Sequence, residues 1–138
     1  MANISVTTRY VSPQDDSLPP LALQITRMVG SYMLWVGMAE GGPDRVAEAP
    51  LRGNLCKDWA CAMPCVSGGA GAATALFRTS GSDVALSMAQ RLAKRFKKQI
   101  FLSVDIPASF LTLGQGARVL LEAEKGVVAA LKELETGE

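Results

Sequence analysis

The stretch QRLAKRFKKQIFLSV, residues 90–104, changes from the period of a helix to the period of a strand. Just before this stretch and in its first half, apolar and small residues recur at helical spacing: Ala85, Met88, Ala89, Leu92 and Phe96. From Gln99 onward, apolar residues occupy every second position: Ile100, Leu102 and Val104. The sequence therefore predicts a helix that begins near Ser82, whose hydroxyl can cap the first turn, and a strand that ends before Pro107.

Five further segments either alternate with a period of two or are apolar throughout, as is typical of strands. They cover residues 4–11, 21–28, 31–38, 58–64 and 73–79. Residues 32–36 are apolar on both faces, which predicts either a central strand covered on both sides or an edge strand that needs a partner. A second helix is predicted over about residues 116–134 from an apolar face of Ala117, Leu120, Val127, Leu131 and Leu134.

The order of these elements predicts the fold class. Strands that follow one another through short connections favour antiparallel pairing, because each parallel crossover needs about a dozen residues or more. We expect one α+β domain over residues 1–138, in which a mostly antiparallel sheet packs against two amphipathic helices. Residues 39–54, AEGGPDRVAEAPLRGN, have no clear periodicity and are predicted to form a long flexible loop.

Composition bounds the environment of the protein. The chain has 138 residues, of which 49% are apolar and 20% charged, and this is enough to build a compact core. Its formal net charge of +1 provides no overall field that would attract nucleic acid or anionic lipid. The N-terminus does not resemble a secretory signal, and no apolar run is long enough to span a bilayer. We therefore expect a cytoplasmic protein, present also in the nucleus, that binds neither membranes nor nucleic acid.

The chain contains no histidine, which removes the commonest general base and every Ser–His or Cys–His pair. We find no catalytic constellation, and we predict a protein that is not an enzyme and needs no cofactor. Cys56, Cys61 and Cys65 are an odd number of cysteines, with no histidine to complete a four-ligand zinc site. They are predicted to be reduced, buried or half-buried thiols rather than metal ligands.

The opening stretch also carries five of the fourteen basic residues of the chain: Arg91, Lys94, Arg95, Lys97 and Lys98. Cations at the end of a helix complement its dipole, but about one or two of them are enough for that effect. Phe96 lies on the predicted core face, so that stacking on a single-stranded nucleic acid is poorly supported. We predict that this basic cluster docks onto an acidic protein surface. Trp35 is a further candidate partner contact, although core packing is the default for a strand tryptophan.

Three motifs resemble one known family. YMLWVG at 32–37, WACAMP at 59–64 and QRLAKRFKKQIFLSVDI at 90–106 are similar, in this order and with similar separations, to the proteasome assembly chaperone 4 family. The resemblance covers most of residues 20–106. It implies a small α+β protein that pairs with proteasome assembly chaperone 3, a partner of like fold. It also implies that the pair helps α-type subunits form the ring of the 20S proteasome and leaves as β-type subunits arrive. The segment 39–54 is longer than the family pattern, and residues 107–138 resemble it only loosely.

The resemblance leads to a non-catalytic assembly chaperone that works by transient binding. Its partner is expected to cover an apolar face of the sheet or helices, while the basic cluster or nearby loops contact an α-type subunit. Two other classes stay open. A nucleic-acid binder would lose affinity steeply as salt rises, and the near-neutral net charge argues against it. A small scaffold of a trafficking or GTPase-regulating complex would share the composition and would be recognised by the proteins that co-purify with it.

Overall fold

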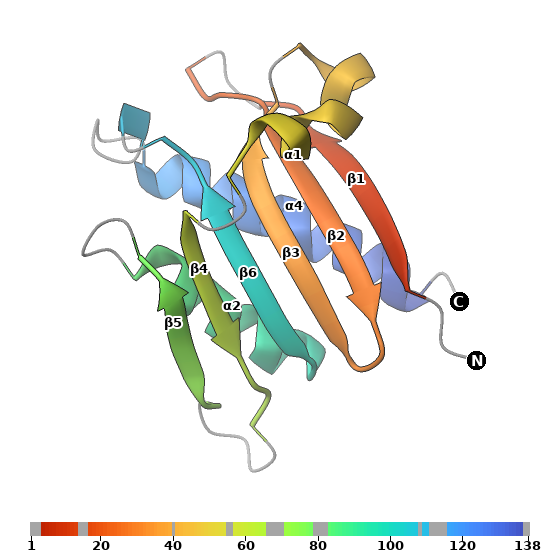
Figure 1. Ribbon diagram of the computed structural model, residues 1–138, viewed down its shortest axis with the longest axis vertical. Helices are drawn as coiled ribbons and strands as arrows, with labels where there is room; N and C mark the ends of the chain where they lie inside the picture. Colours follow the sequence, from red (N-terminus) through yellow and green to blue (C-terminus); the bar gives the residue numbers. More distant parts are fainter. Residues whose placement is uncertain are drawn as a thin grey trace.

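The computed structural model describes residues 4–13, 17–39, 41–54, 57–65, 71–78, 83–107, 109–110 and 116–136. Its strands are β1 (Ser5–Val11), β2 (Leu21–Met28), β3 (Ser31–Met38), β4 (Asp58–Ala62), β5 (Ala73–Phe77) and β6 (Gln99–Asp105). Its helical elements are η1 (Pro43–Glu48), α1 (Ala49–Arg52), α2 (Val84–Phe96) and α4 (Gly116–Thr136). The strands form one sheet in the order β1-β2-β3-β6-β4-β5 (Figure 1). All neighbouring pairs are antiparallel except β3 and β6, so the predicted α+β class with a mostly antiparallel sheet is confirmed.

The first three strands form a meander whose bounds agree closely with the prediction. β2 covers residues 21–28, as the alternation indicated, and β3 covers residues 31–38, the segment that is apolar on both faces. A two-residue turn, Val29 and Gly30, joins them, and Gly30 takes the positive φ of 69° that glycine tolerates best. This short connection fixes the register and places Met28 opposite Ser31.

The second half of the sheet is built out of chain order. After β3 the chain forms the β4–β5 hairpin, passes through α2, and returns as β6 between β3 and β4. The crossover makes β6 parallel to β3, whereas it is antiparallel to β4. β3 therefore lies between β2 and β6, and of the two predictions for residues 32–36 the central strand is the one observed.

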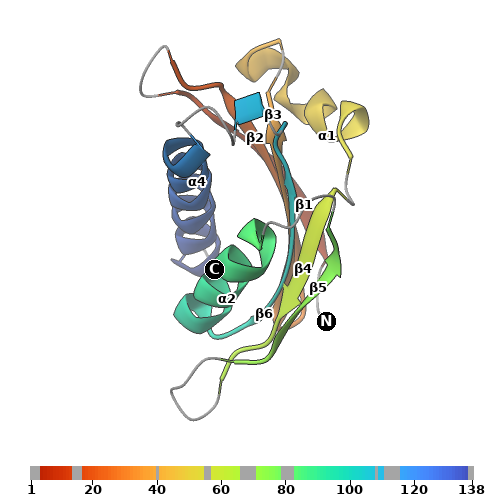
Figure 2. The same ribbon diagram turned by 90° about the vertical axis from the view of Figure 1, so that its left-hand side faces the viewer.

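Both long helices cover the same face of the sheet (Figure 2), as predicted. α4 packs against β1 and β2, and α2 packs against β4, β5 and β6. Between the layers lies one core, because the strand residues that point toward the helices are almost all aliphatic. Its largest members with less than 2% exposure include Leu21, Leu23, Ile25, Tyr32, Leu34, Met88, Leu92, Ile100, Leu102 and Leu131. Burial of each such side chain stabilises the fold by roughly 1.5–3 kcal/mol.

The segment 39–54 differs from the irregular loop that the sequence predicted. Within it, η1 and α1 follow one another and lie against the face of the sheet that α2 and α4 leave free (Figure 2). Pro43 and Pro50 lie in the first turns of these elements, where a missing N–H costs nothing. Packing explains why such short helices form: Ala49 is buried in a small second core with Ala22 and Trp35. Flexibility of this segment stays a prediction.

The ends of α2 are set by different means. The predicted cap Ser82 lies outside the described residues, and Asp83 takes the N-cap position without a side-chain capping bond. The Asp83 carboxylate instead accepts a hydrogen bond of 2.5 Å from Arg78. At the other end, Lys97 adopts the left-handed conformation with φ 56° and donates its N–H to the carbonyl of Ala93. Among the described helices, none is long and apolar enough to cross a membrane.

Candidate interaction surfaces

The basic cluster at the end of α2 divides into cations that hold the fold and cations that face solvent. Arg91 donates three hydrogen bonds of 2.6 to 3.1 Å to the carboxylate of Glu124 on α4. Lys98 donates a hydrogen bond of 2.9 Å to Glu135, near the end of the same helix. The first ion pair connects α2 to α4, and the second connects the turn after α2 to the same helix. Two members of the predicted cluster therefore stabilise the packing of α4.

Both ion pairs raise the pKa of their cations, which favours the charged form. The hydrogen bond that Arg91 donates to Glu124 raises the pKa of Arg91 against the opposing effect of burial. The hydrogen bond that Lys98 donates to Glu135 is the main cause that raises the pKa of Lys98. The Lys98 ammonium also lies 5.1 Å from the centroid of the Tyr32 ring. Burial, followed by the charge of Glu135, raises the pKa of the Tyr32 phenol.

The other three cations of the cluster, Lys94, Arg95 and Lys97, are exposed. Within the described part of the chain they form no ion pair. They can meet an acidic partner, because they are not paired among the described residues. The structure thus separates the five cations into two that are paired and three that are not, and binding of a partner by this cluster stays a prediction.

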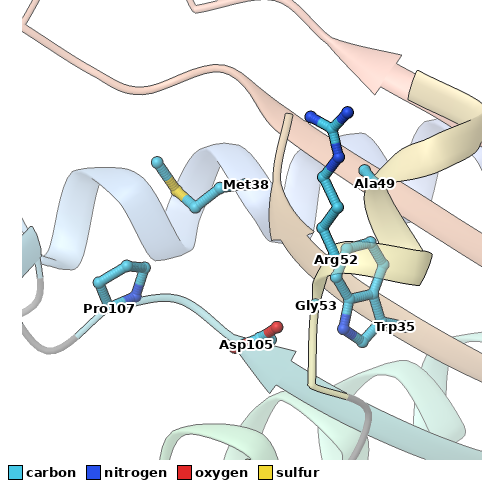
Figure 3. Close-up of a pocket in the computed structure, with 7 residues that line it drawn as sticks. All are labelled: Trp35, Met38, Ala49, Arg52, Gly53, Asp105 and Pro107. Carbon is cyan, nitrogen blue, oxygen red and sulfur yellow. The ribbon is translucent and has the colours of Figure 1, made fainter. Parts of the chain in front are cut away.

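Trp35, the remaining candidate contact, is buried, with 3% of its surface exposed. Its ring lies over Gly37 and Gly53, where an added Cβ would come within 2.1 and 2.5 Å of the indole. These glycines therefore leave the space that the ring fills. The ring lines a small cavity of about 170 Å³ together with Arg52, Asp105 and neighbouring residues (Figure 3). In this position Trp35 packs beneath α1 and offers little surface to a partner.

A different surface, on the sheet itself, carries the exposed apolar side chains. Strand registers align one row across the sheet: Val6, Thr26, Met33, Phe101, Cys61 and Thr74. The next row contains Thr8, Gln24, Trp35, Ser103, Trp59 and Phe77. Both rows point away from α2 and α4, since the residues between them belong to the main core. We call the part of this face beyond α1 the open face, comprising Met33, Trp59, Cys61, Met63, Leu76, Phe77 and Phe101.

The open face is unusually apolar for a surface in contact with water. Met33 is 40% exposed and Phe77 is 51% exposed, with the half-buried Trp59 and Phe101 beside them. Contiguous apolar patches of this kind mark interaction sites more often than single exposed residues do. Sequence reasoning missed Met33, Phe77 and Phe101 as site residues. The apolar character of both faces of the third predicted strand was the signal that could have found them.

Two of the three cysteines lie in the described part of the chain, Cys61 in β4 and Cys65 shortly after this strand. Cys61 and Cys65 are half-buried reduced thiols, and the Gln99 side-chain amide contacts the Cys61 sulfur at 3.5 Å. Cys56 lies outside the described residues. No group of three metal-ligating side chains occurs among the residues that the structure describes. What the arrangement offers chemically is therefore apolar area and unneutralised positive charge, both of which suit protein recognition.

Comparison with known proteins assigns the family. The model of the family described as proteasome assembly chaperone 4 matches residues 20–106. The chain belongs to the proteasome assembly chaperone 4 family. The matched region contains five of the six strands together with α2 and most of the open face. The sequence resemblance to this family is confirmed, and the family assignment makes the protein an assembly chaperone of the proteasome, a role that consists of binding.

A solved structure shares the fold of this chaperone. The chain is similar to a chain from the crystal structure of a chaperone complex for yeast 20S proteasome assembly, with a TM-score of 0.64 and 16% sequence identity. The match covers 94% of this chain and 95% of the yeast chain. It therefore extends the shared architecture beyond residues 20–106, to β1 and α4. No curated protein sequence matches the chain.

Proposed function

We propose that this chaperone pairs through its open face with proteasome assembly chaperone 3, a second chaperone of like fold, and that the pair promotes formation of the α-ring by transient binding of α-type subunits. The observation that carries the proposal is the group of exposed apolar side chains on the open face, with Met33 on the central strand β3 and Phe77 on the edge strand β5. Two sheets that meet face to face bury such rows in a layer about 10 Å thick. A partner sheet would thus supply the cover that this chain lacks.

The chemistry of the open face favours a protein partner over a small ligand or a lipid. Its apolar side chains come from four different strands and spread over a surface, whereas ligand sites are concave. Aromatic residues and methionine, which are enriched at protein interfaces, make up five of its seven residues: Met33, Trp59, Met63, Phe77 and Phe101. Its position on a rigid sheet also supports docking with little loss of conformational entropy.

The contact with α-type subunits is assigned to the exposed cations of the basic cluster, Lys94, Arg95 and Lys97. They lie on the helix side of the molecule, opposite the open face, so both partners could bind at the same time (Figure 2). A contact through exposed charges is weak and salt-sensitive, which fits a chaperone that must release its client. We place this activity in the cytoplasm and nucleus, where proteasome subunits must meet.

The proposal is tested by purifying the tagged protein from its own cells and identifying the bound proteins by mass spectrometry. We expect a second small chaperone together with α-type proteasome subunits and few mature β-type subunits. Charge reversal of Lys94, Arg95 and Lys97 should reduce recovery of α-type subunits while the second chaperone stays bound. Charge reversal of Lys98 would break its ion pair with Glu135. This variant is the comparison that shows how much binding is lost through reduced stability alone. Recovery of trafficking, GTPase-regulating or nucleic-acid machinery without proteasome subunits would refute the proposal.

A further inference from the structure

A groove runs between α2 and α4 on the outer side of the helix layer. It consists of two adjoining hollows of about 460 and 360 Å³ that share Arg95, Glu124 and Val128. Each hollow is in the size range of pockets that bind a ligand or an inserted side chain. Because the groove lies on the opposite side of the sheet from the open face, a partner on the open face would leave it accessible (Figure 2).

The floor of the groove is apolar and partly uncovered. Leu121 is 52% exposed, Ala129 is exposed, and Val128 is half-buried between them. Val128 and Ala129 lie seven and eight residues after Leu121, two turns further along the same side of α4, with Lys125 in the turn between. Leu92 of α2 also lines the groove. An exposed leucine in the middle of a long helix gains nothing from water, so this stripe is suited to receive apolar side chains of a partner.

The rim of the groove is strongly basic. Five cationic side chains line the two hollows: Arg91, Lys94, Arg95, Lys125 and Lys132. Glu124, the one carboxylate among the described lining residues, already accepts hydrogen bonds from Arg91. Lys125 lies 3.9 Å from a carboxylate oxygen of Glu122 and is also paired. The helix dipole could account for Lys94 and Arg95 in the last turn of α2, but not for Lys132, which lies on α4 and forms no ion pair among the described residues. The unpaired positive charge of the groove therefore comes from both helices.

We infer that this groove binds an acidic amphipathic helical segment of a client protein. Apolar residues at positions i, i+3 or i+4 and i+7 of such a segment would fill the stripe from Leu121 to Ala129. Its flanking carboxylates would meet Lys94, Arg95 and Lys132, which form no ion pair within the described residues. A nucleic acid fits less well, because the described residues that line the groove include no aromatic side chain to stack on bases. The inference deepens the proposed α-subunit contact, and rests on it for the identity of the client.

The inference is tested with a synthetic helical peptide that carries leucines along one face and glutamates along both flanks. Fluorescence anisotropy measures its binding to the full chain. We expect a Leu121→Glu variant to weaken binding by about tenfold or more, since the carboxylate would occupy the apolar floor and repel the peptide. Leu51→Glu is the matched control, because Leu51 is also exposed, at 85%, but lies on α1 outside the groove. A double variant, Lys125→Gln and Lys132→Gln, should lower the affinity for the peptide and make that affinity less dependent on salt. Glutamine has a helix propensity close to that of lysine, so α4 should stay intact.

Several outcomes would overturn the inference. One is equal binding of the peptide to Leu121→Glu and Leu51→Glu, and another is equal binding of a peptide in which glutamines replace the glutamates. Preferential binding of a single-stranded oligonucleotide, with a steep loss as salt rises, would point to a different class of ligand. Purification from cells separates this inference from the proposed function. If α-type subunits bind Leu121→Glu as well as the parent, the groove is not their binding site, and the proposed function is unaffected. If the peptide binds the groove but no α-type subunits are recovered, the groove is a binding site and the proposed function is refuted.

Discussion

The two faces of the sheet are made by the same strands, yet they differ in what covers them. On the face under α2 and α4, Leu34 and Leu102 are 2% and 0% exposed. One residue earlier in each strand, Met33 and Phe101 point to the other face, where Met33 is 40% exposed. Adjacent positions thus differ in function. Leu34 and Leu102 stabilise the fold of the single chain, whereas we propose that Met33 and Phe101 contact a partner.

The comparison also explains the position of α1 and η1. They cover the end of the second face where Trp35 and Ala22 lie, and leave the remainder exposed. The covered end is a small second core, with Ala39 and Ala49 completing it. The second face is therefore half core and half open face, and the four predictions below probe where that division lies.

The largest effect is expected from Leu102→Ala, which leaves a cavity in the core beneath the helices. We expect it to reduce the free energy of unfolding by about 2–5 kcal/mol. The same substitution on the open face, Leu76→Ala, should cost no more than about 1 kcal/mol in the isolated chain, because Leu76 is 44% exposed. Urea denaturation of both variants measures the difference. A similar loss for the two variants would mean that the open face is part of the core of the single chain.

Gly37→Ala probes the covered end of the second face. A Cβ at this position would lie 2.1 Å from the Trp35 ring, so the ring has to move, at a cost of about 1–3 kcal/mol. Displacement of the ring into water should also shift the tryptophan emission to longer wavelength. In a Trp35→Leu background the fused ring is gone, and Gly37→Ala should cost much less, which a double-mutant cycle will show. Additive costs in the cycle would contradict the close approach of ring and glycine.

Met33→Glu places a charge in the middle of the open face. In the isolated chain it should change stability by about 1 kcal/mol or less, since the carboxylate can reach water. Binding to the second chaperone should weaken by about tenfold or more, because the charge would be buried without a partner. Val29→Glu, at an apolar position that is 73% exposed in the β2–β3 turn, is the control. If both variants bind the second chaperone as well as the parent chain, the partner does not use this face.

Local sequence patterns predicted much of this fold. Alternation was enough for β2, and a continuous apolar run was enough for β3, since both strands cover the segments that these patterns indicated. The two long helices followed from the spacing of their apolar faces. The insertion of β6 between β3 and β4 was not predictable in the same way, because it depends on which strands meet after a long excursion of the chain. The short helices within 39–54 were missed because packing on Trp35, not periodicity, holds them.

The candidate site was harder to predict for a related reason. The cations of the basic cluster were visible in the sequence, but their partners Glu124 and Glu135 lie 33 and 37 residues further along the chain. Sequence alone could not show that Arg91 and Lys98 are engaged while Lys94 and Arg95 are exposed. The open face was hidden because its residues and the core residues are both apolar, so that composition does not distinguish them. Strand register and the position of the helices decide which set is covered.

The smallest expected effect is a loss of stability at alkaline pH, caused by titration of Lys98 and Tyr32. Lys98 has a raised pKa, so the stabilisation from its pair with Glu135 is complete below its ordinary pKa of 10.5 and is lost as pH rises through the raised value. Tyr32 acts in the same direction, because burial favours its neutral phenol, whose ordinary pKa is 10.0. We therefore expect the thermal unfolding midpoint to fall as pH rises above about 10.

Substitution separates this local effect from general alkaline unfolding. Lys98→Met should lower stability slightly at neutral pH and make the midpoint less dependent on pH above 10, because the titrating ammonium is gone. Lys94→Met should leave the dependence unchanged, since Lys94 forms no ion pair among the described residues. If the parent, Lys98→Met and Tyr32→Phe show the same pH dependence of the unfolding midpoint, titration of Lys98 and Tyr32 does not cause the loss of stability at alkaline pH. The boundary of the covered face would then be set by packing of α2 and α4 alone, and not by the charges that join them.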